Sequence, residues 1–202
     1  MISESPLATR IFDVLVKGGI MAEQFPMLIR GGIADAGVTV HSHFLTFLAT
    51  VGQSLGFSAI AECPIIWAER SKVGDVVADS VWFDKETLTA RVAIEFERFE
   101  HGDEPKLRQK VENLAIASLA CRDLELSLLI YWVRTGSAPR SMENVVDVYR
   151  TGFRRWGRNV QAAVSPLMIF KCVMRPEKGG HSLLFGEFLR DERNEGLAIR
   201  TF

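Results

Sequence analysis

The sequence is poor in cysteine and has no long apolar run. Its three cysteines, Cys63, Cys121 and Cys172, stand far apart, form no Cys-x-x-Cys pair and are odd in number. We therefore expect reduced thiols and no disulfide framework. The longest apolar run, 124–133, contains a glutamate and falls well short of the roughly 18 residues of a membrane span. The first residues also lack the order of a secretory signal, so a cytoplasmic protein without a membrane span is expected.

Neither sign of charge dominates the whole chain, which has 24 Lys and Arg against 25 Asp and Glu. A hydrophobic fraction of 48% and a charged fraction of 24% exclude a disordered or fibrous chain. The length of 202 residues fits one domain, in which we distinguish an N-terminal extension (1–42), a core (43–133) and a C-terminal region (134–202).

Charge is nevertheless unevenly distributed along the chain. Residues 1–133 carry 12 cationic against 18 anionic side chains, whereas residues 134–175 carry 8 against 2. A cation site beside a phosphate-binding surface would produce this asymmetry, and solvated helix faces would produce it as well.

Hydrophobic periodicity predicts both helices and strands. The expected helices cover 7–16, 44–55, 106–120 and 141–163. The expected strands cover 57–67, 76–83, 92–97 and 124–133, followed by two short strands within 168–174 and 183–189. A turn at 84–87 joins two of these strands in a hairpin. Because a helix separates 92–97 from 124–133, these two strands should pair in parallel, and we expect an α/β fold with a central mixed β-sheet flanked by helices.

Three carboxylates on the predicted hairpin suggest a chemistry. Glu95 and Glu97 are two residues apart, so strand alternation places both on one face of the sheet. If the hairpin brings Asp79 opposite them, three negative charges gather and repel one another unless a divalent cation compensates. Such a cation activates water for phosphodiester hydrolysis. On alternation alone, a solvated sheet face with surface carboxylates is the commoner explanation.

The segment 43–133 resembles the core of the PD-(D/E)xK nuclease superfamily, the restriction-endonuclease-like fold. That core consists of a helix, a three-stranded meander, a second helix and a further strand. The resemblance implies catalytic roles for Glu62 in AIAECPII, Asp79 in VVADSVWFD and Glu95 in VAIEFER. Asp79 and Glu95 would hold Mg²⁺, with Mn²⁺ as the other candidate ion. Glu97 stands where the family motif has lysine, and it would hold a second ion or polarise water.

A lysine on the following helix can replace the motif lysine in some members of that family. Lys106 and Lys110 lie four residues apart and share a helix face. Lys110, further into the helix, is the candidate that the resemblance favours, and a solvent-facing lysine is the alternative. The implied substrate is DNA, and the resemblance also allows a homodimer, for which the sequence carries no direct signal.

The basic C-terminal region is consistent with DNA binding. Arg150, Arg154 and Arg158 repeat every four residues within the predicted helix 141–163, with Arg155 and Trp156 beside them. Such a stripe would contact backbone phosphates without reading sequence. The alternative is an exposed arginine face with Trp156 in the core.

The sequence has one close pair of histidines, and it lacks the common motifs of other enzyme classes. His41 and His43 precede an apolar segment and indicate the start of a helix rather than a metal site. The chain has no P-loop, GxSxG elbow or GxGxxG fingerprint.

Three hypotheses remain: a metal-dependent DNA nuclease, an inactive nuclease-like domain that binds nucleic acid or supports assembly, and an unrelated α/β protein with surface carboxylates. The position of Asp79 relative to Glu95 discriminates the third from the other two.

Overall fold

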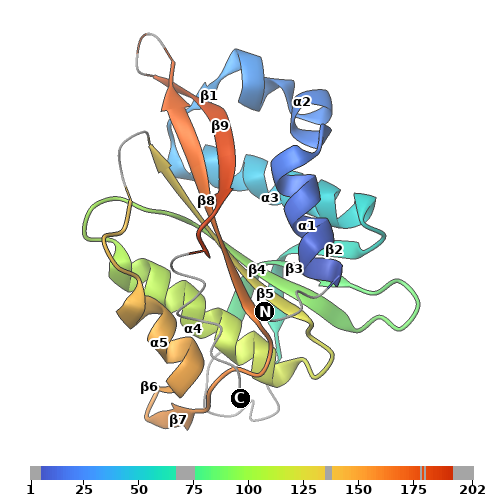
Figure 1. Ribbon diagram of the computed structural model, residues 1–202, viewed down its shortest axis with the longest axis vertical. Helices are drawn as coiled ribbons and strands as arrows, with labels where there is room; N and C mark the ends of the chain where they lie inside the picture. The colour runs from blue at the N-terminus through green and yellow to red at the C-terminus, as the bar shows by residue number, and fades with distance from the viewer. Residues whose placement is uncertain (1–5, 67–75, 135–137, 178, 180, 193–202) are drawn as a thin grey trace.

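The computed structural model describes residues 6–66, 76–134, 138–177, 179 and 181–192, and it has an α/β fold built on one mixed sheet (Figure 1). The seven strands run in the order β1 (Ile33–Ala34), β9 (Ser182–Arg190), β8 (Leu167–Pro176), β5 (Leu126–Arg134), β4 (Ala90–Arg98), β3 (Val76–Phe83) and β2 (Ser58–Ile65). The predicted fold class is therefore confirmed.

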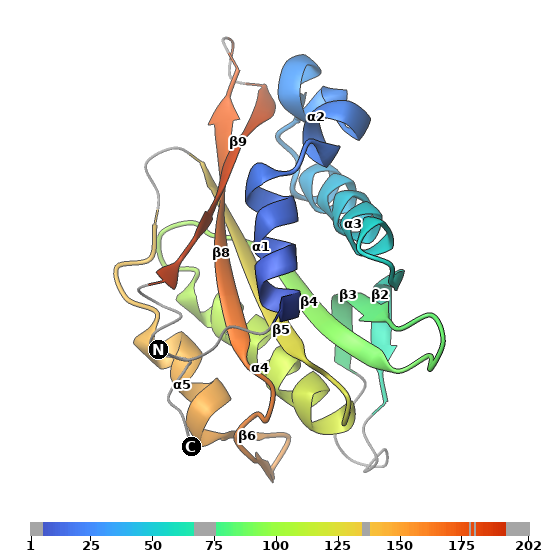
Figure 2. The same cartoon turned by 45° about the vertical axis from the view of Figure 1, so that its right-hand side comes forward.

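Helices cover both faces of this sheet (Figure 2). One face is covered by α1 (Pro6–Lys17), α2 (Ile20–Gln24), the π-helical turn η1 (Met27–Gly31) and α3 (Gly37–Ser54). The other is covered by α4 (Glu104–Ala120) and α5 (Glu143–Thr151). No helix in the described part of the chain is long and apolar enough to cross a bilayer.

Strand alternation divides the apolar side chains between two cores. Along β4, Ile94 and Phe96 pack with the α3 layer, whereas Ala93 packs with the α4 layer. Every residue of β5 except the last is buried, which confirms the prediction of a strand covered on both faces. Glu95 points toward the α4 layer, where its carboxylate contacts Lys110 and Asn113.

The order of elements around the site is α3, β2, β3, β4, α4, β5. The strands β2, β3 and β4 form an antiparallel meander, and β5 pairs in parallel with β4 across the α4 crossover, as predicted. The C-terminal strands are longer than expected: β8 pairs in parallel with β5, and β9 pairs antiparallel with β8. Position 67, the end of the expected strand 57–67, lies outside the described residues, and β2 ends at Ile65.

The prediction of a helix over 141–163 is wrong. The helix α5 ends at Thr151, and β6 (Phe153–Arg155) and β7 (Arg158–Val160) form a separate hairpin. Gly152 has φ +81°, and a Cβ there would lie 2.3 Å from the carbonyl oxygen of Val160, so only glycine permits this close approach. Arg154, Arg155 and Arg158 consequently do not extend a helical stripe from Arg150.

The prediction that His41 and His43 mark a helix start is also inaccurate. The helix α3 begins at Gly37, so both histidines lie within its first two turns. The apolar period from Phe44 onward revealed only the later turns of this helix, because Val40 is the only buried residue among positions 37–43. His41 thereby acquires a position facing the sheet.

Candidate metal and nuclease site

The site lies where the ladder between β3 and β4 ends. The last paired residues are Ser80 on β3 and Ile94 on β4. Asp79 and Glu95 are the next residues along each strand beyond this pair, at the point where pairing stops. In place of a ladder bond, Oδ2 of Asp79 accepts a hydrogen bond of 2.7 Å from the N–H of Phe96. The carboxylate of Asp79 thus fills the gap between the two strands.

The neighbouring ladder between β2 and β3 is interrupted at the same level. Ala61 pairs with Ser80 and Cys63 with Ala78, while Glu62 between them is unpaired in the register and has φ +50°. A left-handed conformation is unfavourable for a residue with a side chain by about 1 kcal/mol or more, and such residues concentrate at functional sites. Carboxylates from three adjacent strands are therefore presented at one level of the sheet.

Lys110 connects two of these carboxylates. Its Nζ donates hydrogen bonds of 2.9 and 2.8 Å to Oδ1 and Oδ2 of Asp79 and lies 2.7 Å from Oε2 of Glu95. Asp79 is 4% exposed and Glu95 is 0% exposed. The hypothesis of surface carboxylates is contradicted, because both groups are buried and converge on one ammonium. Lys106, the other candidate lysine, instead pairs with Asp103 at 2.8 Å.

Burial and charge set different protonation states for the three groups. Burial alone would raise the pKa of Asp79, but the hydrogen bond with His41 and the ammonium of Lys110 outweigh it and lower this pKa to about 2. Burial, with the nearby charge of Asp79, raises the pKa of Glu95 well above its usual value. Burial opposes the charge of Lys110, but Glu95 and Asp79 together raise its pKa. Asp79 and Lys110 are thus the firmly ionised pair.

His41 reaches the same carboxylate from the other face of the sheet. Its Nε2 lies 3.4 Å from Oδ1 of Asp79, and its Nδ1 lies 3.9 Å from Oε1 of Glu62. The hydrogen bond with Asp79 raises the pKa of His41, although burial opposes this. One ligand atom from each of His41, Glu62 and Asp79 lies within 4.8 Å of the others, so this group could hold a metal ion.

Sequence reasoning missed His41, although a signal for it was present. His41 precedes Phe44 by three residues and Leu48 by seven, which is the spacing of one helix face. Both apolar residues face the sheet. Had the helix been extended back to Gly37, His41 would have been placed on the face that meets the carboxylates.

An open pocket gives access to this group. It is lined by Gly37, Val38, His41, Ser42, Glu62, Glu97, Arg98, Lys106 and Trp132. Glu97 is half-buried there, and its Oε1 accepts a hydrogen bond of 3.0 Å from the N–H of Arg98. The guanidinium of Arg98 stacks over Trp132, with Cζ 5.0 Å from the ring centroid. The pocket therefore combines acidic groups near Asp79 with two cations at its rim.

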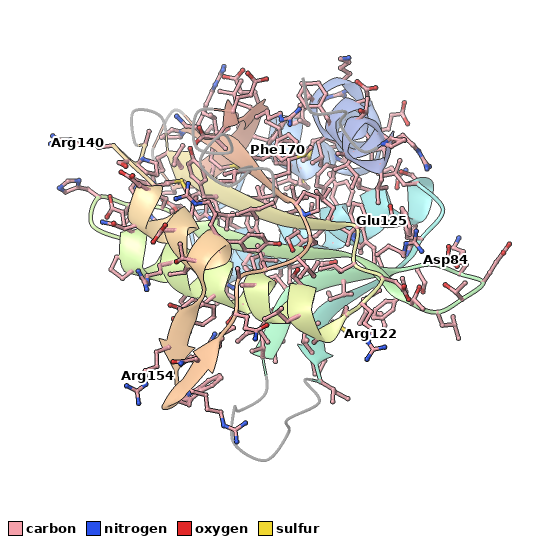
Figure 3. All side chains as sticks on the ribbon, turned by 60° about the horizontal axis from the view of Figure 1, so that its bottom comes forward. Asp84, Arg122, Glu125, Arg140, Arg154 and Phe170 are labelled. Carbon is pink, nitrogen blue, oxygen red and sulfur yellow. The ribbon has the colours of Figure 1, made fainter. Side chains whose placement is uncertain are left out.

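The predicted DNA-binding arginines are not brought together on one face. Arg150 pairs with Asp147 at 3.1 Å on α5, whereas Arg154 is exposed on the β6–β7 hairpin and points away from the body of the molecule (Figure 3). Arg158 lies on β7 and is half-buried. Arg155 turns inward and donates a hydrogen bond of 2.8 Å to Oδ1 of Asn113.

Asn113 joins that arginine to the buried acid. Its Nδ2 donates a hydrogen bond of 3.1 Å to Oε1 of Glu95. A chain of contacts thus runs from the hairpin through Arg155 and Asn113 to Glu95, and from there to Lys110 and Asp79. Of the residues predicted from sequence, Asp79, Glu95 and Lys110 meet directly, Glu62 and Glu97 line the adjoining pocket, and Arg155 contacts the site from outside.

Comparisons with known proteins give no family assignment: no protein-family model, curated protein or solved structure matches the chain.

Proposed function

We propose that this protein is a divalent-metal-dependent nuclease that hydrolyses phosphodiester bonds of DNA. The observation that carries the proposal is the convergence of Asp79 and Glu95, from two diverging strands, on Lys110 of the following helix. This constellation agrees with the resemblance to the PD-(D/E)xK superfamily, with the lysine supplied by α4 in place of position 97.

The donor chemistry of the pocket fits a divalent cation. Asp79 is ionised, Glu62 has a side chain that is 60% exposed, and His41 offers an imidazole nitrogen beside both. Mg²⁺ prefers oxygen ligands and keeps several waters, whereas the divalent first-row metals, which include Mn²⁺, bind sites that mix nitrogen and oxygen donors. The proposed ligands are therefore His41, Glu62 and Asp79, and Mn²⁺ should bind more tightly than Mg²⁺.

This ligand set modifies the expectation that Asp79 and Glu95 hold the ion together. Glu95 is fully buried and contacts Lys110 and Asn113 rather than the pocket. In the proposal it is a positioning residue, because it fixes the ammonium of Lys110 against Asp79.

The bound ion would lower the pKa of a water molecule and neutralise charge on the scissile phosphate. Glu97, on the wall of the pocket, polarises the attacking water. Arg98 and Lys106 in the pocket lining attract the phosphate. Lys110 lies outside this lining and contacts Asp79 and Glu95, so its role is to hold the Asp79 carboxylate in place. The attacking water would lose a proton to Glu97 as its oxygen forms the new P–O bond, the ester P–O bond would break, and the departing alkoxide would take up a proton from solvent.

The test combines metal titration by calorimetry with plasmid nicking. Glu62→Gln is the main variant, because an exposed side chain can lose its charge without unfolding the protein. His41→Ala is the second variant, and Glu86→Gln, on the exposed turn of the β3–β4 hairpin, is the matched control. We expect the first two to weaken Mn²⁺ binding at least about tenfold and to abolish nicking, consistent with loss of one ligand. Wild-type protein that neither binds Mn²⁺ at millimolar concentration nor nicks DNA would overturn the proposal.

A second candidate is an inactive nuclease-like domain that binds nucleic acid or supports assembly. It is favoured by one observation: the ammonium of Lys110 already compensates Asp79 and Glu95, so these carboxylates need no metal to coexist. This candidate predicts DNA binding that is unchanged by chelators, without cleavage under any metal condition.

A further inference from the structure

The tip of the β6–β7 hairpin has an unusual residue for its backbone conformation. Arg155 pairs with Arg158, so the loop consists of Trp156 and Gly157 alone. Their φ angles are +48° and +78°, the pattern of a type I′ turn. Asn-Gly is the favoured pair for this turn, because asparagine tolerates the left-handed conformation. Tryptophan at the first position is therefore unfavourable for the local backbone conformation.

Packing does not explain this tryptophan. Trp156 is 49% exposed, although tryptophan is usually highly buried. The guanidinium of Arg155 covers its ring, with Cζ 4.2 Å from the ring centroid. Since one face of the indole is stacked and half of the side chain is still open, the ring presents an aromatic surface to solvent.

Guanidinium groups lie beside that surface, together with the carboxylate of Glu112, which forms an ion pair with Arg108. Arg154 is exposed on the outer side of the hairpin, next to the tip (Figure 3). Between the hairpin and α4 lies a pocket lined by Pro105, Arg108, Gln109, Glu112, Arg155 and Trp156. An open aromatic plane flanked by guanidinium groups is complementary to a nucleobase joined to a phosphate backbone.

The hairpin is also connected to the buried site. Arg155 stacks on Trp156 and bonds to Asn113, which in turn bonds to Glu95. The position of the exposed ring is therefore set by the same network that holds Glu95 and Lys110. A nucleotide bound at the tip would be held in a defined relation to the proposed nuclease centre.

We propose that the β6–β7 hairpin is a stacking platform for an unpaired DNA base, with Trp156 contacting the base and Arg154 contacting the backbone. Paired bases are stacked on their neighbours within a duplex, so the platform selects single-stranded or locally opened DNA. The inference rests on the proposed function for the identity of the ligand, and it narrows the substrate to DNA with unpaired bases.

The test measures binding without cleavage. Fluorescence anisotropy of a labelled oligothymidylate and of a blunt duplex is recorded in EDTA, so metal-dependent hydrolysis does not contribute. The variant is Trp156→Asn, which places the favoured Asn-Gly pair in the turn and removes the ring. We expect affinity for the single strand to fall roughly tenfold, with duplex affinity changed by less than about twofold. Trp156→Phe should recover most of the single-strand affinity.

Thermal denaturation provides the structural control. If Trp156 served to hold the hairpin, Trp156→Asn would lower the melting temperature; the turn preference predicts an unchanged or higher value. Equal single-strand affinity of Trp156→Asn and wild type would overturn the platform, as would wild-type protein that prefers the duplex. Wild-type protein that binds the single strand but does not nick plasmid DNA would instead contradict only the nuclease proposal.

Discussion

Lys110 donates hydrogen bonds to both carboxylate oxygens of Asp79, a residue 31 positions earlier in the chain. The same ammonium lies 2.7 Å from Glu95, so one cation from α4 joins two strands at the point where they diverge. Removal of a carboxylate or of the ammonium would leave the remaining groups buried without compensation. The arrangement therefore has consequences for stability as well as for the proposed chemistry.

Lys110→Met should destabilise the protein strongly. The substitution retains much of the aliphatic chain but leaves Asp79 and the fully buried Glu95 without the ammonium. We expect the free energy of unfolding to fall by about 3 kcal/mol, measured by urea denaturation. Lys106→Met is the matched control on the same helix, because Lys106 is exposed and should change little. Equal effects of the two substitutions would refute the buried ion pair.

Gly52→Ala should destabilise the protein although alanine is the better helix former. An alanine Cβ at this position would lie 2.8 Å from the indole of Trp82, which is fully buried and cannot move freely. The overpacking should cost about 1–3 kcal/mol, more than the helix propensity returns. Gly37→Ala, at the start of the same helix, has no atom within 4 Å and is the control. Calorimetric melting of both variants tests this prediction. A rise in Tm for Gly52→Ala would show that residue 52 is not tightly packed against Trp82.

Stability should decline at alkaline pH partly through Tyr149. Burial raises the pKa of this hydroxyl, which donates a hydrogen bond of 2.9 Å to the carbonyl oxygen of Ser165. The unfolded chain loses this proton above pH about 10 while the folded protein keeps it. The contribution of Tyr149 to the free energy of unfolding is thus fully present below that pH, and it falls by up to about 1.4 kcal/mol per pH unit above it.

Tyr149→Phe isolates this contribution. The substitution removes the hydroxyl and its hydrogen bonds to the carbonyl oxygen and Oγ of Ser165, at a cost of about 1 kcal/mol each, but it also removes the titrating group. Chemical denaturation between neutral and alkaline pH should therefore give a shallower decline for the variant than for wild type. Cys172 contributes with the same sign in both proteins, because burial raises its pKa. Parallel profiles would show that Tyr149 titrates normally in the folded state.

The three free thiols should differ in reactivity. Cys172 is fully buried, whereas Cys121 is partly exposed at the C-terminal end of α4. Because a thiol reagent needs access to the sulfur, native protein should react at Cys121 first and at Cys172 only after unfolding. A colorimetric thiol assay in native buffer and in denaturant, with Cys121→Ser as the control, measures this order. Fast reaction of Cys172 in native protein would contradict its burial.

The local patterns of the sequence were sufficient for the fold class and for part of the site. Alternation along 92–97 placed Ile94 and Phe96 on one face and Glu95 on the other, as the structure has them. The choice of Lys110 over Lys106 followed from its place on α4, and the structure brings that residue to both acids. The strand faces were predictable because the strand period depends on near neighbours in the chain, whereas the preference for Lys110 came from the family resemblance.

The prediction failed where a single residue changed the direction of the chain. The arginines after Arg150 had helical spacing, but Gly152 ends the helix and Trp156-Gly157 reverses the chain. Spacing alone cannot distinguish a continued helix from a hairpin of the same length. The expected arginine stripe is therefore absent: Arg155 points inward to Asn113, and Arg154 points outward.

Local periodicity predicts which faces of the strands carry acids, and the family resemblance adds the helix that carries the lysine. Three features of the site follow from tertiary packing: β3 and β4 separate at Asp79, Glu62 adopts a left-handed conformation, and His41 reaches the same carboxylate from the opposite layer. Those outcomes depend on how two helical layers pack against one sheet. The free energy of that packing is shared among residues far apart in the chain, so no short pattern records it.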